Sequence, residues 1–159
     1  MKVRKAAIAE SKAASAIEAA GLDRHIGFVL RLAQVAVFKD LLTALKPLEL
    51  RLADFSALLV IETNPGLTQQ ALGEALRIQR PNLVAIIDQL QARGLVRRGT
   101  APGDRRSHAL ALTPPGEALL TEAKAAYAKH EKRVAKTLGP VDSEALLSAL
   151  KRLADLPAS

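Results

Sequence analysis

The fold of this chain is best indicated by the residues Gly103-Asp104-Arg105-Arg106-Ser107-His108-Ala109-Leu110-Ala111-Leu112-Thr113. The turn pair Pro102-Gly103 opens it and the pair Pro114-Pro115 stops it. Upstream, Leu95-Val96-Arg97-Arg98-Gly99 has the composition of a second short strand. Two short strands joined by a turn that contains glycine indicate a β-hairpin. We therefore expect a hairpin over residues 95–113, with adjacent arginines at its tip.

The residues before this hairpin predict a pair of short helices. Asn64-Pro65-Gly66 is a turn signal, and Thr68 is a good N-cap for a helix over Gln69–Leu76. A second helix follows over residues 80–92, and Gly94 ends it. Its apolar face consists of Leu83, Ile86, Ile87 and Leu90. A helical pair that leads into an arginine-tipped hairpin is the layout of a winged helix-turn-helix, which binds duplex DNA.

Further helices are expected on both sides of this unit. Residues 1–20 are rich in Ala, Ser, Lys and Glu and predict a frayed or weakly helical arm. Periodicity and helix-stop signals predict four helices, and these are 21–47 (closed before Pro47), 52–63, 114 to about 138, and 142 or 143 to about 156.

The helix expected over 21–46 is apolar on nearly every side, and such a helix must be buried. One small winged-helix core cannot cover it, so the simplest partner is a second copy of the chain related by a two-fold axis. We expect a mainly α (α+β) fold in which the domain 21–159 follows the arm 1–20. Its DNA-binding lobe is 48–113, and its interleaved dimerisation helices are 21–47 and 114–157.

Composition excludes several classes of protein. The chain has 159 residues, 49% of them hydrophobic, and no cysteine, so disulfides, thiolate metal sites and cysteine catalysis are excluded. The longest apolar runs, such as 83–87, are far shorter than the roughly 20 residues of a membrane span. The basic residues near the N-terminus precede no continuous apolar run. We expect a cytoplasmic protein without a cofactor or a membrane partner.

The net charge of +7 is concentrated in one segment. Residues 77–108 hold seven arginines and two aspartates, which leaves +5 in this segment. Every cation there is an arginine, whose planar guanidinium suits phosphates and guanine edges. Together with the hairpin, this predicts a nucleic-acid-binding surface.

In a helix-turn-helix the start of the second helix reaches base edges in the major groove. The residues expected there are Gln79, Arg80, Pro81, Asn82 and Ala85. Arg80 can donate a fork to guanine O6 and N7, whereas Asn82 or Gln79 can pair with adenine N6 and N7. Ala85 is small enough for close approach or contact with a thymine methyl. The alternative is an ordinary helix start with Asn82 as an internal cap.

The remaining contacts are expected from the wing and from the start of the first helix of the pair. Arg105 and Arg106 at the wing tip would enter the flanking minor groove, where narrow A·T tracts concentrate negative potential. Arg97, Arg98 and Thr68 would hold phosphates, which position the protein without reading sequence.

The chain resembles the MarR family of winged-helix regulators over roughly residues 22–156, and three segments carry this resemblance. They are Leu67-Thr68-Gln69, Asp88-Gln89-Leu90-Gln91-Ala92-Arg93-Gly94-Leu95-Val96, and Asp104-x-Arg106 followed six residues later by Leu112-Thr113. The resemblance implies that Asp104 and Arg106 order the wing, and that Arg106 pairs with Asp88. It also implies a dimeric repressor that a small, often aromatic and anionic, ligand releases from DNA. The second helix of the pair departs from many members, because it starts Gln-Arg-Pro-Asn rather than with Ser and Thr.

A ligand site is indicated within the helix over 21–46. Phe28, Arg31, Val35, Phe38 and Leu42 share one face of it, and a guanidinium among apolar side chains needs an anion or water. We expect Arg31 to be the counter-charge of a ligand anion, with Phe28, Phe38 and Phe55 lining an apolar slot and His25 as a possible donor. The ligand would be an aromatic acid or its CoA thioester. The alternative is an ion pair of Arg31 with Asp40, Glu49 or Glu62, or extension into solvent.

Other functions have weaker support in the sequence. The three histidines 25, 108 and 130 lie on separate expected elements, and no Gly-rich phosphate loop is present, so an enzyme is disfavoured. Asp104 and His108 fit wing structure better than a catalytic dyad. Zinc sensing would need clustered ligands, and His130-Glu131 or His25 with Asp23 is a weak set. A winged helix that binds protein, or a regulator that activates rather than represses, stays open.

Overall fold

The computed structural model describes residues 21–101 and 104–157, with side chains at 21–99 and 109–157. The chain divides into two compact units, one up to Phe38 and the other from Lys39 onward. The expected arm 1–20 and the turn 102–103 lie outside the described residues. Within the described part, no helix is both long enough and apolar enough to cross a bilayer.

The first unit holds a short 3₁₀ helix, η1 (Leu22–Arg24), and most of α2 (Ile26–Leu45). The helix expected from Gly21 therefore begins five residues later than predicted, at Ile26. Gly21 has a φ of 76° and His25 is extended, with φ −96° and ψ 122°, so neither continues a helix. The His25 carbonyl accepts hydrogen bonds from the amides of Phe28 and Val29 at 3.1 Å, which starts α2.

The second unit begins with the end of α2, followed by the 3₁₀ turn η2 (Lys46–Leu48) and helix α3 (Leu52–Thr63). Pro47 lies in η2, so the helix stops at Leu45, slightly before the expected end. Asp54 fixes the start of α3, because its carboxylate accepts hydrogen bonds from the backbone and the guanidinium of Arg51 at 3.0 Å. Asp54 is fully buried, and Arg51 supplies its counter-charge.

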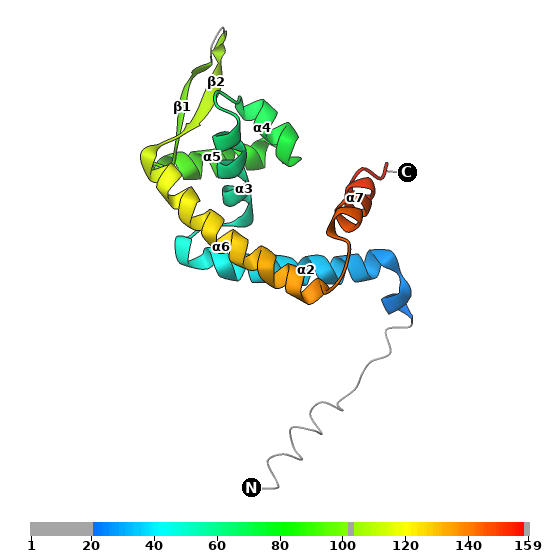
Figure 1. Ribbon diagram of the computed structural model, residues 1–159. Coiled ribbons are helices and arrows are strands. Elements are labelled where there is room, and N and C mark those ends of the chain that lie inside the picture. Colours follow the sequence, from blue (N-terminus) through cyan, green and yellow to red (C-terminus); the bar gives the residue numbers. More distant parts are fainter. Residues whose placement is uncertain (1–20, 102–103, 158–159) are drawn as a thin grey trace, which may run out of the picture. The chain divides into compact units, whose positions relative to one another are not determined.

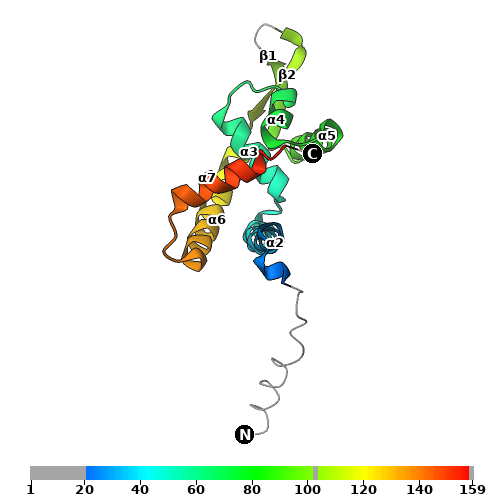
Figure 2. The ribbon, with the colours of Figure 1, turned by 90° about the vertical axis from the view of Figure 1, so that its right-hand side faces the viewer.

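Helices α4 (Gln69–Leu76) and α5 (Arg80–Ala92) form the helical pair, and β1 (Val96–Ala101) and β2 (Asp104–Leu112) form the antiparallel wing. The register runs from Val96 opposite Leu112 and is interrupted after Thr100. The amide of Leu110 also donates to the carbonyl of Leu67 at 2.8 Å, so the segment before α4 adds to the base of the wing. Figures 1 and 2 show the hairpin projecting from the helices at its base. This arrangement confirms the winged helix-turn-helix and the mainly helical fold.

Two helices complete the second unit, α6 (Pro114–Leu138) and α7 (Ser143–Ala154). Thr113 caps α6 by accepting a hydrogen bond from the amide of Gly116 at 3.2 Å. Asp142 caps α7 through the amides of Glu144 and Ala145. Both helices lie where the sequence predicts them.

The core of the second unit lies where α3, α4, α5, α6 and the wing meet. Its side chains include the expected apolar face of α5, and the largest fully buried ones are Leu45, Leu58, Ile61, Leu72, Leu83, Ile87, Leu90, Leu110 and Leu120. Helix α7, in contrast, has no buried residue. Leu147, Leu150 and Leu153 leave 55%, 37% and 42% of their surface exposed.

Candidate nucleic-acid interface

The start of α5 presents a set of exposed side chains, three of which are polar. The apolar residues Leu83, Ile86 and Ile87 are buried, which turns the other face of the helix outward. The exposed residues are the expected base-contact set Gln79, Arg80, Pro81, Asn82 and Ala85. The structure thus places all five together on one helix end. Free backbone N–H groups at such an end favour an anion.

The start of α5 is not capped by Asn82. Gln79 is the N-cap residue, with φ −61° and ψ 140°, and its side chain makes no capping hydrogen bond. Pro81 lies in the first two helical positions, where its fixed φ suits a helix and its missing N–H costs nothing. The side chains of Gln79 and Asn82 are therefore not used to hold the helix start.

Thr68 caps α4 as expected, since its hydroxyl accepts a hydrogen bond from the Ala71 amide at 3.2 Å. It also forms a β-bridge with Ala109 of the wing. The hydroxyl can still donate a hydrogen bond, so the predicted phosphate contact of Thr68 is compatible with its structural role.

The arginines of segment 77–108 are not equivalent. Arg77 donates to the Ala154 carbonyl at 2.8 Å and to the Asp155 carboxylate at 2.6 Å. Arg93 donates to the carbonyls of Glu49 and Leu48 at 2.8 and 3.3 Å. Their guanidinium groups serve the fold, so they add less to a DNA surface than the charge count suggests.

The two neighbouring arginines of β1 differ in the same way. Arg97 is exposed, whereas Arg98 is half-buried and donates to Gln91 and Asp88 at 2.7 and 2.6 Å. Gln69 accepts a third, longer hydrogen bond from Arg98 at 3.4 Å. Asp88, the expected partner of Arg106, thus pairs with Arg98. The side chains of Asp104, Arg105 and Arg106 lie outside the described residues, so their roles in the wing stay predictions.

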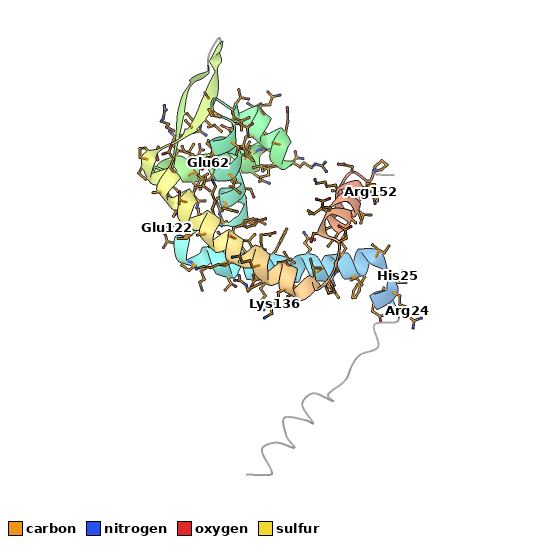
Figure 3. The ribbon with its side chains drawn as sticks, viewed as in Figure 1. Arg24, His25, Glu62, Glu122, Lys136 and Arg152 are labelled. Carbon is orange, nitrogen blue, oxygen red and sulfur yellow. The ribbon has the colours of Figure 1, made fainter. Side chains whose placement is uncertain are left out.

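The expected ligand residues divide between the two units. In the first unit, the guanidinium carbon of Arg31 lies 5.3 Å from the centre of the Phe28 ring, a cation–π contact. Arg31, Phe38 and His25 are exposed, and His25 precedes α2 (Figure 3). Phe55 belongs to the second unit and is only 2% exposed, which makes it a core residue there.

Two of the three carboxylates considered as partners of Arg31 are engaged with other cations. Asp40 accepts hydrogen bonds from Arg133, whose Nη2 lies 2.7 Å from Asp40 Oδ2. Glu62 of α3, labelled in Figure 3, pairs with Lys124 of α6. Both carboxylates therefore already have a cationic partner other than Arg31.

A polar network between α2 and α6 was not foreseen from the sequence. His130 is 1% exposed, and its Nδ1 lies 2.6 Å from Asp40 Oδ2. The hydrogen bonds of Arg133 and His130 lower the pKa of Asp40 to about 2. The Tyr127 ring lies between those of His130 and Phe55, at 5.9 and 5.3 Å, and burial raises the pKa of Tyr127. The only feature of the sequence that pointed to this network was the three-residue spacing of Tyr127 and His130, which places them on one helical face.

The described residues contain no group of three or more His, Cys, Asp or Glu side chains that could hold a metal ion. His130 and Glu131 approach each other, with Nε2 and Oε1 3.9 Å apart, but His130 is committed to Asp40.

Comparison with known proteins agrees with this geometry. Residues 48–107 match the model of the MarR family. The chain is 34% identical to a protein of Thauera aromatica assigned to transcriptional regulation of the hcr operon, over 81% of this chain and 78% of the relative. The chain belongs to the MarR family.

Solved structures of MarR-family proteins extend the likeness to nearly the whole fold. The transcriptional repressor CouR, bound to a 23-mer DNA duplex, is 42% identical with a TM-score of 0.83, over 88% of this chain and 99% of CouR. CouR bound to p-coumaroyl-CoA is 40% identical with a TM-score of 0.79, over 87% of this chain and 97% of CouR. This chain is accordingly a transcriptional regulator of the MarR family.

Proposed function

We propose that this chain is a dimeric repressor that binds a palindromic DNA duplex and leaves it when an anionic aromatic ligand binds. The observation that carries the proposal is the exposed set Gln79, Arg80, Pro81, Asn82 and Ala85 at the start of α5, which is followed by a wing that bears arginines. Within this set, Gln79, Arg80 and Asn82 have side-chain donors and acceptors that match base edges in the major groove. The ligand is an aromatic acid or, with stronger support from CouR, its CoA thioester.

The dimer is supported by apolar surface that this chain leaves exposed. In the first unit, Ile26, Val29 and Val35 of α2 are 73%, 46% and 57% exposed. In the second unit, α7 exposes its leucines in the same way. Apolar surface of this extent calls for a partner. A second copy would cover both helices and would present two copies of α5 to two half-sites.

The effector part of the proposal rests on Arg31. Its guanidinium is exposed and lies over the Phe28 ring, so a charged group and an aromatic face occur together in the first unit. A ligand with an aromatic ring and a carboxylate or phosphate has matching chemistry. To release DNA, such a ligand must bind the DNA-free dimer more tightly than the DNA-bound one.

The test uses a duplex selected from a random pool with the unmodified protein and labelled for fluorescence anisotropy. p-Coumaroyl-CoA, free p-coumarate and CoA alone are added separately. We expect p-coumaroyl-CoA to release the duplex and to raise the melting temperature of the free protein. Release by p-coumarate alone would assign the free acid as effector, and failure of all three would contradict this ligand class.

Two variants locate the ligand site. Arg31→Ala should abolish the response while leaving DNA affinity nearly unchanged. Arg24→Ala removes a neighbouring exposed arginine of the first unit and is the matched control, with an unchanged response. Should Arg31→Ala instead prevent dimerisation or folding, the arginine has a structural role and the ligand site lies elsewhere.

A further inference from the structure

Arg98 connects three elements of the DNA-binding lobe through a single guanidinium. The side chain starts on β1, and its Nη1 donates to Gln91 Oε1 at 2.7 Å. Its Nη2 donates to Asp88 Oδ1 at 2.6 Å and to Gln69 Oε1 at 3.4 Å. Gln91 and Asp88 belong to α5 and Gln69 is the first residue of α4. The base of the wing is thus fastened to both helices of the pair.

The neighbouring residue Arg97 offers a direct comparison. Successive side chains of a strand point to opposite faces, so Arg97 and Arg98 face different surroundings. Arg97 is opposite Ala111 in the ladder and is exposed, whereas Arg98 is opposite the fully buried Leu110. Only 24% of the Arg98 side chain is accessible.

A phosphate would compete with Asp88 for Arg98. The carboxylate is already within 2.6 Å of the guanidinium, so a phosphate drawn to Arg98 would also be repelled by Asp88. Displacing Asp88 would in turn release the wing from α5. The charge of Arg98 is therefore already paired with a carboxylate of the same chain.

We infer that Arg98 is a positioning residue that fixes the wing against α4 and α5, with Asp88 as its counter-ion, and that it neutralises no phosphate. This inference rests on the proposed DNA binding and replaces the phosphate contact expected from the sequence. Specific binding requires α5 and the wing to engage one site at a set spacing. Removing the Arg98 hydrogen bonds should therefore harm binding to a specific duplex more than binding to unrelated DNA.

The sign of an Asp88→Asn effect shows whether Asp88 holds an arginine, and the double variant below shows whether that arginine is Arg98 or the predicted partner Arg106. If Asp88 is only a negative charge near DNA, its removal lowers repulsion and strengthens binding to every duplex. If Asp88 holds Arg98, its removal weakens binding to the selected duplex, by roughly tenfold for loss of a charged hydrogen bond. Arg98→Gln in the Asp88→Asn background should then add little further loss, because both changes break the same ion pair.

The salt dependence of binding provides the second measurement. Removing one arginine–phosphate interaction should flatten the log–log slope by about 0.9, or by roughly 1.8 for the two subunits of a dimer. Arg97→Gln, the matched control, should flatten the slope and weaken selected and scrambled duplexes alike. Arg98→Gln and Arg98→Lys should keep the wild-type slope while weakening the selected duplex more than the scrambled one.

The outcomes distinguish this inference from the proposed function. Stronger binding by Asp88→Asn, or equal flattening of the slope by Arg98→Gln and Arg97→Gln, would overturn the positioning role alone. If the unmodified protein selects no duplex and shows no salt-dependent binding, the proposed function and the inference fall together. Thermal unfolding of each variant checks that it is folded. If Arg98→Gln is unfolded, Arg98→Lys, which keeps the charge, takes its place in the comparison.

Discussion

Among the glycines of the described residues, Gly116 is the one at which an added Cβ would meet the nearest atom. A Cβ built on this residue would lie 2.0 Å from the carbonyl oxygen of Leu95 and 3.0 Å from its carbonyl carbon. Both atoms are backbone and cannot move aside as a flexible side chain would. The missing side chain allows the first turn of α6 to approach the start of the wing, and this close approach joins the two elements.

We predict that Gly116→Ala destabilises the protein by at least about 1–3 kcal/mol, the usual cost of forcing extra atoms into a packed site. Gly27→Ala is the control, because a Cβ on Gly27 meets no atom within 4 Å and Gly27 is helical. That change should be neutral or stabilising by up to about 1 kcal/mol. Urea unfolding of the two variants tests this, and equal midpoints would contradict the packing argument.

Asp40 makes the stability depend on pH in acid. Its pKa is lowered from 3.8 to about 2 by Arg133 and His130, so the folded state favours the ionised carboxylate. The stabilisation is present in full above pH 3.8 and is lost as the pH falls toward 2. We therefore expect Asp40→Asn to be less stable than the unmodified protein at pH 5, with the gap narrowing toward pH 2. The measurement is the free energy of unfolding of both proteins as a function of pH. A constant difference between them from pH 5 to pH 2 would exclude a contribution from the Asp40 ion pair.

Local pattern was enough to predict some side chains of the candidate site and not others. The exposed set at the start of α5 follows from helical periodicity, because burying Leu83, Ile86 and Ile87 turns Arg80 and Asn82 outward. The role of Arg98 depends on Asp88 and Gln69, which are 10 and 29 residues away in the chain. No periodicity links such residues, so only the folded arrangement separates Arg98 from Arg97.

At the scale of elements, Gly, Pro and N-cap residues were enough to predict most helix boundaries. Helices α3, α4 and α5 have the bounds expected from sequence. The predicted start of α2 was wrong. Gly21 adopts φ 76°, a 3₁₀ turn follows, and the extended backbone of His25 interrupts the helix. A glycine signals a change of direction, but not how many residues pass before the next helix begins.

Thr113 connects the start of α6 to the loop between α5 and the wing. Its hydroxyl accepts from the Gly116 amide at 3.2 Å and donates to the Gly94 carbonyl at 2.5 Å. We predict that Thr113→Val, which keeps the shape, costs about 0.5–2 kcal/mol. Thr121→Val is the control, since that hydroxyl only donates to the Glu117 carbonyl within the same helix. Equal losses of unfolding free energy at the two positions would show that the Thr113 hydroxyl stabilises the protein no more than an ordinary helix hydroxyl.

At the scale of the whole molecule, the sequence indicated that a partner was needed. It could not indicate how the partner's helices are arranged, because this depends on surfaces that one chain leaves uncovered. The leucines of α7 illustrate this, and Leu147 is 55% exposed. Helical periodicity predicts that they share one face, but it does not predict what covers that face.

We predict that Leu147→Glu shifts the protein from dimer to monomer, because a charge would be buried in an apolar interface. Ser148→Glu places the same charge on the opposite, polar face of α7, where the Ser148 hydroxyl already accepts a hydrogen bond from Arg152. That control should remain dimeric. Light scattering at several concentrations measures both, and a dimer that tolerates Leu147→Glu would remove α7 from the interface.

The most direct test of the proposed function is base discrimination by Arg80 at the exposed start of α5. Affinities of the unmodified protein and of Arg80→Ala are measured for the selected duplex and for every single base-pair change in one half-site. We predict that Arg80→Ala loses discrimination at one position, by about 1–3 kcal/mol per half-site, and keeps it elsewhere. An equal loss of affinity for all duplexes, with discrimination unchanged at every position, would contradict the assignment of α5 as the helix that reads DNA.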